Sequence, residues 1–108
     1  CFKEPELEAY RGRSLLSWFM DLERRAVKLG PAGKIRSPAD AQRVLDAGAD
    51  FVVLGRAAIL HHDYPARLAA DSAFEPVALP VPAAWLAREG LSPPFVNYMR
   101  NWKGFVAD

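Results

Sequence analysis

Residues 37–57, SPADAQRVLDAGADFVVLGRA, hold a helix and a strand in one short stretch. The first four residues are typical of a helix start, because serine is a common N-cap, proline suits the first helical position and aspartate can return the capping interaction. Gly48 can end this helix by adopting a left-handed backbone conformation. The run 51–54 is apolar throughout, which is typical of a strand in a parallel sheet that is covered on both faces.

The signals on either side extend this pattern. Residues 27–33 are predicted as a preceding strand, although Pro31 cannot donate a ladder hydrogen bond and so weakens it. After the second strand, Gly55 leads into a short helix at 57–60, and a further helix starts near Asp63 and runs to residue 70. The order strand, helix, strand, helix predicts a βαβα unit over residues 27–71.

Apolar spacing predicts which helical faces are buried. Ser14 suits an N-cap, and the helix after it should bury a stripe of residues at helical spacing, namely Leu15, Trp18, Phe19, Leu22 and Ala26. The helix that begins after Ser37 should bury Ala41, Val44 and Leu45. Both helices are therefore expected to lie against a core.

The chain from residue 72 onward is rich in proline and should be largely extended. Two short helices are still predicted there. One occupies residues 82–89 and stops at Gly90, and the other uses Ser92 as its cap and presents Phe95, Met99 and Trp102 along one face. The predicted organisation is thus a passage with a helix at 1–26, the βαβα unit at 27–71 and an irregular, partly helical tail at 72–108.

The composition excludes several classes of protein. The net charge is +1, from 14 Lys+Arg and 13 Asp+Glu, and no basic run is present, which argues against a nucleic-acid binder that neutralises phosphates. No apolar stretch approaches the roughly 20 residues of a membrane-spanning helix. The single cysteine allows no internal disulfide and fits a reducing compartment, so we expect a cytoplasmic protein.

Each of the two predicted strands ends in a glycine turn. Gly33 and Lys34 follow the first strand, and Gly55 and Arg56 follow the second. Glycine lets backbone N–H groups approach a phosphate closely, and arginine can add a charge-assisted contact. In eight-stranded (β/α) barrels such a phosphate site recurs in the loops after strands 7 and 8. The alternative is that both glycines are only turn residues.

The other motifs indicate no catalytic or metal site. Residues 30–34, GPAGK, differ from a P-loop in glycine spacing and lack the Ser or Thr after the lysine. His61, His62 and Asp63 are adjacent, and adjacent residues on a helix point in different directions, so they make a poor set of ligands for one metal ion. We expect no metal site and interpret these histidines as a solvated helix end. No residue of this chain is predicted to be catalytic.

Residues 33–41, GKIRSPADA, and 48–57, GADFVVLGRA, resemble the end of the barrel in the old yellow enzyme family of NADH:flavin oxidoreductases. The resemblance continues through Tyr64 and Pro65 and through the tail 91–102, LSPPFVNYMRNW. Other phosphate-binding barrels share the Gly-Arg pair, but its combination with the tail is more specific.

The resemblance implies the C-terminal portion of a TIM (β/α)8 barrel, about βα units 7 and 8, plus the tail. It implies an ene-reductase-like flavoprotein in which FMN, reduced by NADH or NADPH, passes a hydride to an activated alkene such as an enone or a related unsaturated carbonyl. In such enzymes the amides at the positions of Gly33, Lys34, Gly55 and Arg56 hold the FMN phosphate. Residues 97–102 are similar to a run whose arginine reaches a neighbouring subunit's active site, which makes Arg100 a candidate for that contact in a homo-oligomer.

A complete barrel needs roughly 200–250 residues, so we expect a fragment that does not catalyse alone. Cys1 in place of Met agrees with a piece of a longer chain, and an N-terminal nucleophile or a lipidated cysteine is the alternative. Two other functions stay open, namely a phosphate-binding TIM-barrel enzyme without flavin and a truncated, non-catalytic assembly module.

Overall fold

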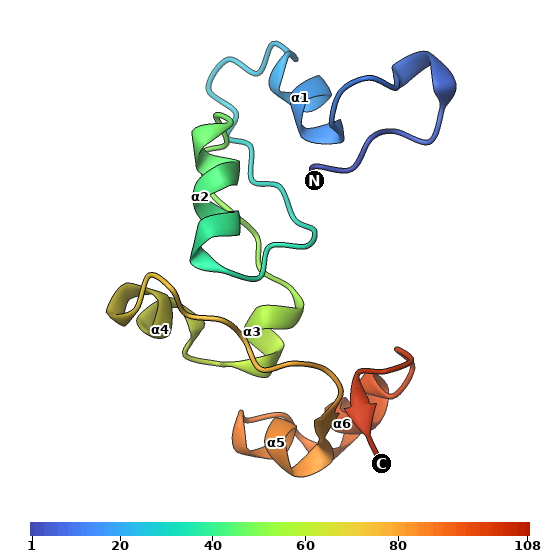
Figure 1. Cartoon of the computed structure of the whole chain (residues 1–108), viewed down its shortest axis with the longest axis vertical. Coiled ribbons are helices and arrows are strands. Elements are labelled where there is room, and N and C mark those ends of the chain that lie inside the picture. The colour runs from blue at the N-terminus through green and yellow to red at the C-terminus, as the bar shows by residue number, and fades with distance from the viewer. The chain divides into compact units, whose positions relative to one another are not determined.

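The computed structural model describes residues 1–108 and divides the chain into two compact units. The N-terminal unit comprises Cys1–Gly55 and the C-terminal unit comprises Arg56–Asp108. Short helices and brief parallel pairings make up both units (Figure 1). The division between the units falls inside the βαβα stretch that the sequence predicts.

The helices of the N-terminal unit are a 3-10 turn η1 at Glu8–Tyr10, α1 at Leu15–Met20 and α2 at Pro38–Asp46. The predicted cap of α1 is confirmed, because the Ser14 side chain accepts a hydrogen bond from the backbone N–H of Ser17 at 3.2 Å. The helix α1 is shorter than the predicted apolar stripe, which runs on to residue 26.

The predicted capping box of α2 is also confirmed. The Ser37 hydroxyl accepts from the Asp40 backbone N–H, and the Asp40 carboxylate accepts from the Ser37 N–H, both at 3.1 Å. Past the other end of the helix, Gly48 adopts the predicted left-handed conformation with φ of +105°. A Cβ atom there would also lie 2.8 Å from the terminal methyl group of Met20, a flexible side-chain end that can move aside.

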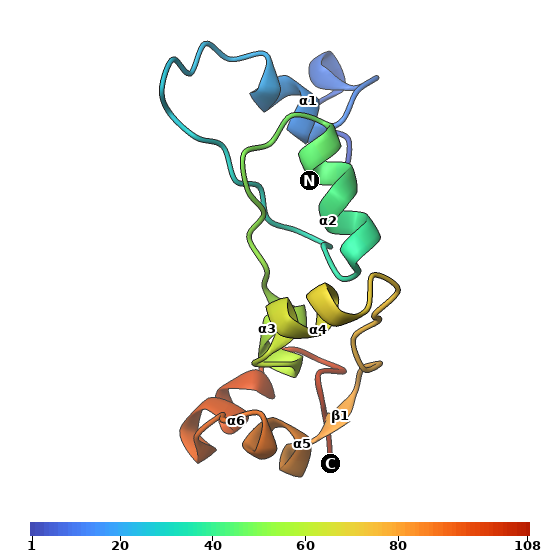
Figure 2. The ribbon, with the colours of Figure 1, turned by 90° about the vertical axis from the view of Figure 1, so that its left-hand side faces the viewer.

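The N-terminal unit contains two extended segments, one before and one after α2 in the sequence, that lie parallel to each other. Ala32 and Val53 form a parallel bridge, and the N–H groups of Asp50 and Val53 donate to the carbonyl oxygens of Leu29 and Pro31 at 2.9 and 3.0 Å. In Figure 2, α2 runs alongside the second segment. The predicted strand, helix and strand are therefore present in the predicted order, but each strand is reduced to a single bridge position.

The core of the N-terminal unit is small. Its buried members are Leu16, Ile35, Val44 and Ala49, with Leu29, Val52 and Leu54 packed against them. The predicted stripe of α1 was wrong: Leu16 is the buried residue, while Leu15, Phe19 and Leu22 are exposed. Leu45 of α2 is likewise exposed, contrary to prediction. Ala26 is exposed as well. Trp18 is partly buried, because the Tyr10 ring lies edge-to-face against it, with centroids 5.5 Å apart, and the Arg13 guanidinium lies 4.3 Å from its ring centroid.

The C-terminal unit contains four helices and a two-stranded parallel sheet. The helices are α3 at Arg56–Leu60, α4 at Tyr64–Ala70, α5 at Ala83–Arg88 and α6 at Pro93–Met99, and the strands are β1 at Val81–Pro82 and β2 at Val106–Ala107. All four helices lie where the sequence predicts them. The parallel pairing of β1 with β2 was not predicted, because each strand has only two residues and one of the four is Pro82.

One apolar cluster holds the C-terminal unit together. Its buried members are Leu60, Val81, Leu86, Val96, Met99 and Phe105. They come from α3, β1, α5, α6 and the turn just before β2, so the cluster joins segments that are far apart in the sequence. Of the face predicted for this last helix, only Met99 is buried, whereas Phe95 and Trp102 are exposed, and Trp102 lies beyond the end of α6. None of the helices in either unit has the length and apolar character needed to cross a lipid bilayer.

Candidate functional site

The first glycine turn leaves the parallel pair immediately after its bridge position. Ala32 is bridged to Val53, and the next two residues, Gly33 and Lys34, both have positive φ values, +113° and +57°. A left-handed conformation is common for glycine but costs roughly 1 kcal/mol or more for lysine. Lys34 is exposed on the surface.

The second glycine turn follows the other partner of the bridge. Gly55 comes two residues after Val53, so both turns lie at the same end of the two parallel segments. Neighbouring strands are about 4.8 Å apart, which sets the scale of the separation at that end. Gly55 has no positive φ, and a Cβ atom placed on it would have no neighbour within 4 Å. The local backbone of this chain therefore does not require glycine at this position.

Some polar groups around the two turns are without partners inside the chain, whereas the carbonyl oxygen of Gly33 accepts a hydrogen bond from the N-terminal ammonium of Cys1 at 3.3 Å. The backbone N–H groups of Lys34 and Gly55 donate no hydrogen bond. The side chain of Lys34 forms no ion pair, and neither does that of Arg56, the exposed residue that is bonded to Gly55 and begins α3. Backbone N–H groups without an acceptor and cationic side chains without an ion-pair partner are groups that an oxyanion can bind.

The capping box of α2 fixes the chain just after the first turn. The Asp40 carboxylate accepts the backbone N–H groups of both Ser37 and Arg36 at 3.1 Å. These hydrogen bonds, with that from Ser37 the larger influence, hold the pKa of Asp40 below its ordinary value. The negative charge of Asp40 is therefore already satisfied by the helix start that it organises.

His61 contradicts the prediction of a solvated helix end. The residue is only 4% exposed, and its ring lies edge-to-face against Phe74 and Trp85, with ring centroids 5.2 and 5.7 Å away. His62, the next residue, is exposed as predicted, with 64% of its side chain accessible. Sequence reasoning missed this difference because α3 has only five residues, too few to show which of the two histidines faces inward.

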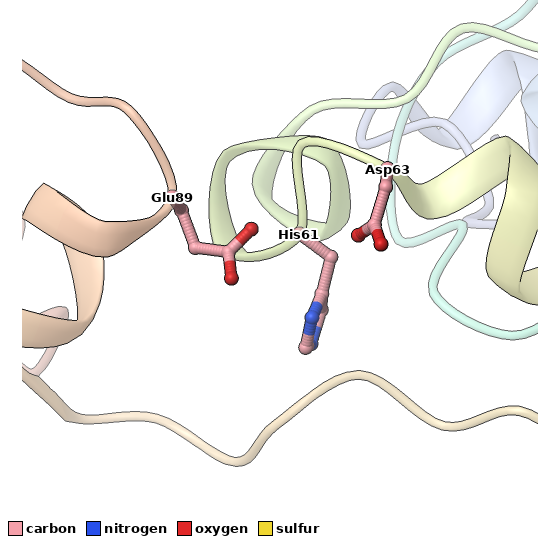
Figure 3. Close-up of side chains that lie close together, drawn as sticks. All are labelled: His61, Asp63 and Glu89. Atoms are coloured by element: carbon pink, nitrogen blue, oxygen red, sulfur yellow. The ribbon is translucent and has the colours of Figure 1, made fainter.

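Two carboxylates lie close to the buried histidine. One ring nitrogen of His61 and carboxylate oxygens of Asp63 and Glu89 lie within 4.8 Å of one another (Figure 3). Asp63 is also paired with Arg67 at 2.7 Å, and Glu89 accepts from the backbone N–H of His62 at 2.9 Å and contacts its Nδ1 at 2.7 Å. The hydrogen bond from the His62 backbone is the main cause that lowers the pKa of Glu89.

Arg100 is held within the C-terminal unit. Its guanidinium pairs with the carboxylate of Asp108 and lines a shallow apolar hollow beside Ala84, Ala87 and Asn97. A contact with a neighbouring subunit would therefore compete with this intramolecular ion pair.

No protein-family model matches the chain, and neither a curated protein nor a solved structure is significantly similar to it.

Proposed function

We propose that this chain is the phosphate-anchoring part of an FMN-dependent oxidoreductase of the old yellow enzyme type. The observation that carries the proposal is the parallel bridge between Ala32 and Val53, because it brings two glycine turns to the same end of two strands. That arrangement is the one in which the last two loops of a (β/α) barrel bind phosphate. The motifs of residues 33–41 and 48–57, described above, supply the link to flavin.

Each of the proposed residues has a distinct task. Gly33 provides the left-handed turn, and Gly55 leaves room for close approach of a ligand. The N–H groups of Lys34 and Gly55 donate to phosphate oxygens, and the side chains of Lys34 and Arg56 balance the phosphate charge. The bound FMN supplies hydride-transfer chemistry toward the activated alkene, with NADH or NADPH as the reductant. The chain itself holds the cofactor and contributes no catalytic residue.

The open face of the parallel pair also agrees with a barrel. Val52 and Leu54 pack against the core beneath α2, whereas Phe51 and Val53 point the other way and are 49% and 42% exposed. In a closed (β/α) barrel the helix-facing and interior-facing residues alternate in this manner, and both sets are apolar. We propose that further parallel strands complete the barrel on this side in a homo-oligomeric parent enzyme.

The proposal is tested by titrating the 108-residue chain with FMN, riboflavin and inorganic phosphate, each followed by NMR shifts of the backbone amides. We expect FMN and phosphate to shift the amides of Gly33, Lys34 and Gly55, and riboflavin, which lacks the phosphate, to shift them far less. Equal affinities of the chain for phosphate and for FMN would favour the phosphate-binding enzyme without flavin. No response to either anion would overturn the phosphate site and leave the non-catalytic assembly module as the better interpretation.

A charge variant sharpens this test. Because Lys34 is exposed, replacing it in Lys34→Gln should weaken phosphate binding by about two- to fivefold, the scale of a surface charge pair. Lys103→Gln is the matched control, since Lys103 is also an exposed lysine without an ion pair but lies far along the sequence from both turns. Equal losses in the two variants would mean that only the net charge matters.

A further inference from the structure

His61 joins three segments of the C-terminal unit. It follows the last residue of α3, and its ring is packed between Phe74 and Trp85. The backbone N–H of Val77 donates to its Nε2 at 2.9 Å. The ring therefore holds the extended segment 74–77 against α3 and α5. That segment matters for stability, because Val77 packs on the apolar cluster of the unit.

The hydrogen bond from Val77 determines which nitrogen carries the proton. Since Nε2 accepts, the neutral ring has its single hydrogen on Nδ1. This Nδ1 is buried and has no hydrogen-bond partner. A metal ion needs a nitrogen lone pair, and here one nitrogen is occupied by Val77 and the other carries a hydrogen. The arrangement with Asp63 and Glu89 is thus not built to ligate a metal.

We propose that His61 is a pH-sensitive switch, and that protonation of its ring releases the segment 74–77. The neutral ring holds the segment in place because its Nε2 accepts a hydrogen bond from the N–H of Val77. A proton taken from solvent binds Nε2 and places a second donor opposite that N–H, so the hydrogen bond is lost and the segment is released. The new proton thus leaves Val77 without an acceptor and frees its side chain from the apolar cluster.

The charges around the ring set the direction of the response. Asp63 and Glu89 favour the protonated ring, whereas Arg67 disfavours it. Burial is the largest influence and, with Arg67, lowers the pKa of His61 below its ordinary value of 6.5. A base with a lowered pKa in the folded state binds fewer protons there than in the unfolded chain. The stabilisation by the neutral His61 ring and its hydrogen bond from Val77 is therefore complete above pH 6.5. It is lost as the pH falls through the pKa of His61 in the folded state.

The test is the hydrogen-exchange protection of the Val77 amide in the full chain, from about pH 8 down to about pH 5. The protection factor, which removes the intrinsic pH dependence of exchange, should fall by about tenfold per pH unit once the pH is below the pKa of His61. The variant His61→Gln offers an oxygen near the position of Nε2 that accepts a hydrogen bond but does not titrate in this range, so its protection should not change with pH. His62→Gln removes the exposed histidine and should behave as the wild-type chain.

A second measurement on the wild-type chain keeps the proposal testable if His61→Gln does not fold. The ¹⁵N shifts of the His61 ring at about pH 8 should show the hydrogen on Nδ1. A hydrogen on Nε2 would overturn the proposal. Protection of the Val77 amide that persists after the ring has become doubly protonated would also overturn it. The same holds if the protection declines equally with pH in His61→Gln.

Discussion

The two units have nearly the same length but differ in how many apolar side chains their buried clusters contain. In the C-terminal unit six buried side chains form one cluster, and the exposed large apolar residues are Phe95, Tyr98 and Trp102 on or just after α6. In the N-terminal unit only four residues form the buried cluster, and nine of the twelve exposed large apolar side chains of the protein lie there. Helix starts do not account for this difference in burial, because the side-chain caps lie in the N-terminal unit. The serines before α1 and α2 form such hydrogen bonds, whereas no side chain caps α4, α5 or α6.

This difference predicts unequal losses for matching core substitutions. Leu86→Ala in the C-terminal unit removes a fully buried side chain from the larger cluster and should cost about 2–5 kcal/mol of unfolding free energy. Leu16→Ala in the N-terminal unit should cost near the lower end of this range, because its smaller core can relax toward solvent. Urea titration with hydrogen exchange resolved for each unit measures both losses. A larger cost for Leu16→Ala would mean that the N-terminal unit is the better packed one.

Secondary structure could be predicted from the sequence wherever one local signal decides it. The capping box at Ser37, the left-handed turn at Gly48 and the positions of all four C-terminal helices are examples. Each of these rests on interactions between residues that are close in the chain. The two glycine turns belong here too, since their common position follows from the strand, helix and strand order around α2.

Burial could not be predicted where it depends on residues far apart in the chain. The spacing of Leu15 and Phe19 predicts a buried apolar face, but both side chains are exposed. Of that face only Trp18 is partly covered, by Tyr10 and Arg13. His61 shows the converse, since Phe74 and Trp85 enclose it from 13 and 24 positions away. Pairing of β1 with β2 also joins distant segments, with Val81 opposite Val106.

Helix capping should matter more in the N-terminal unit, where the core contributes less. Ser37→Ala removes a hydroxyl that accepts a backbone N–H and should destabilise α2 by about 1 kcal/mol. Ser92→Ala is the control in the other unit, because the Ser92 side chain makes no capping hydrogen bond to α6, and its cost should be no more than about 0.5 kcal/mol. Thermal unfolding followed by circular dichroism compares the two variants. Equal shifts in Tm would show that the cap does not distinguish the units.

The smallest effect on stability is expected where the N-terminal unit ends. Gly55→Ala adds a methyl group into open space at a residue with ordinary φ, so the free energy of unfolding should change by no more than about 0.5 kcal/mol. Gly48→Ala is the contrast within the same unit, because its positive φ should make that change clearly destabilising. If Gly55 is kept open for a phosphate, Gly55→Ala should weaken FMN binding while stability is retained. A loss of stability instead would make Gly55 a structural turn residue, and unchanged binding of FMN would remove it from the proposed site.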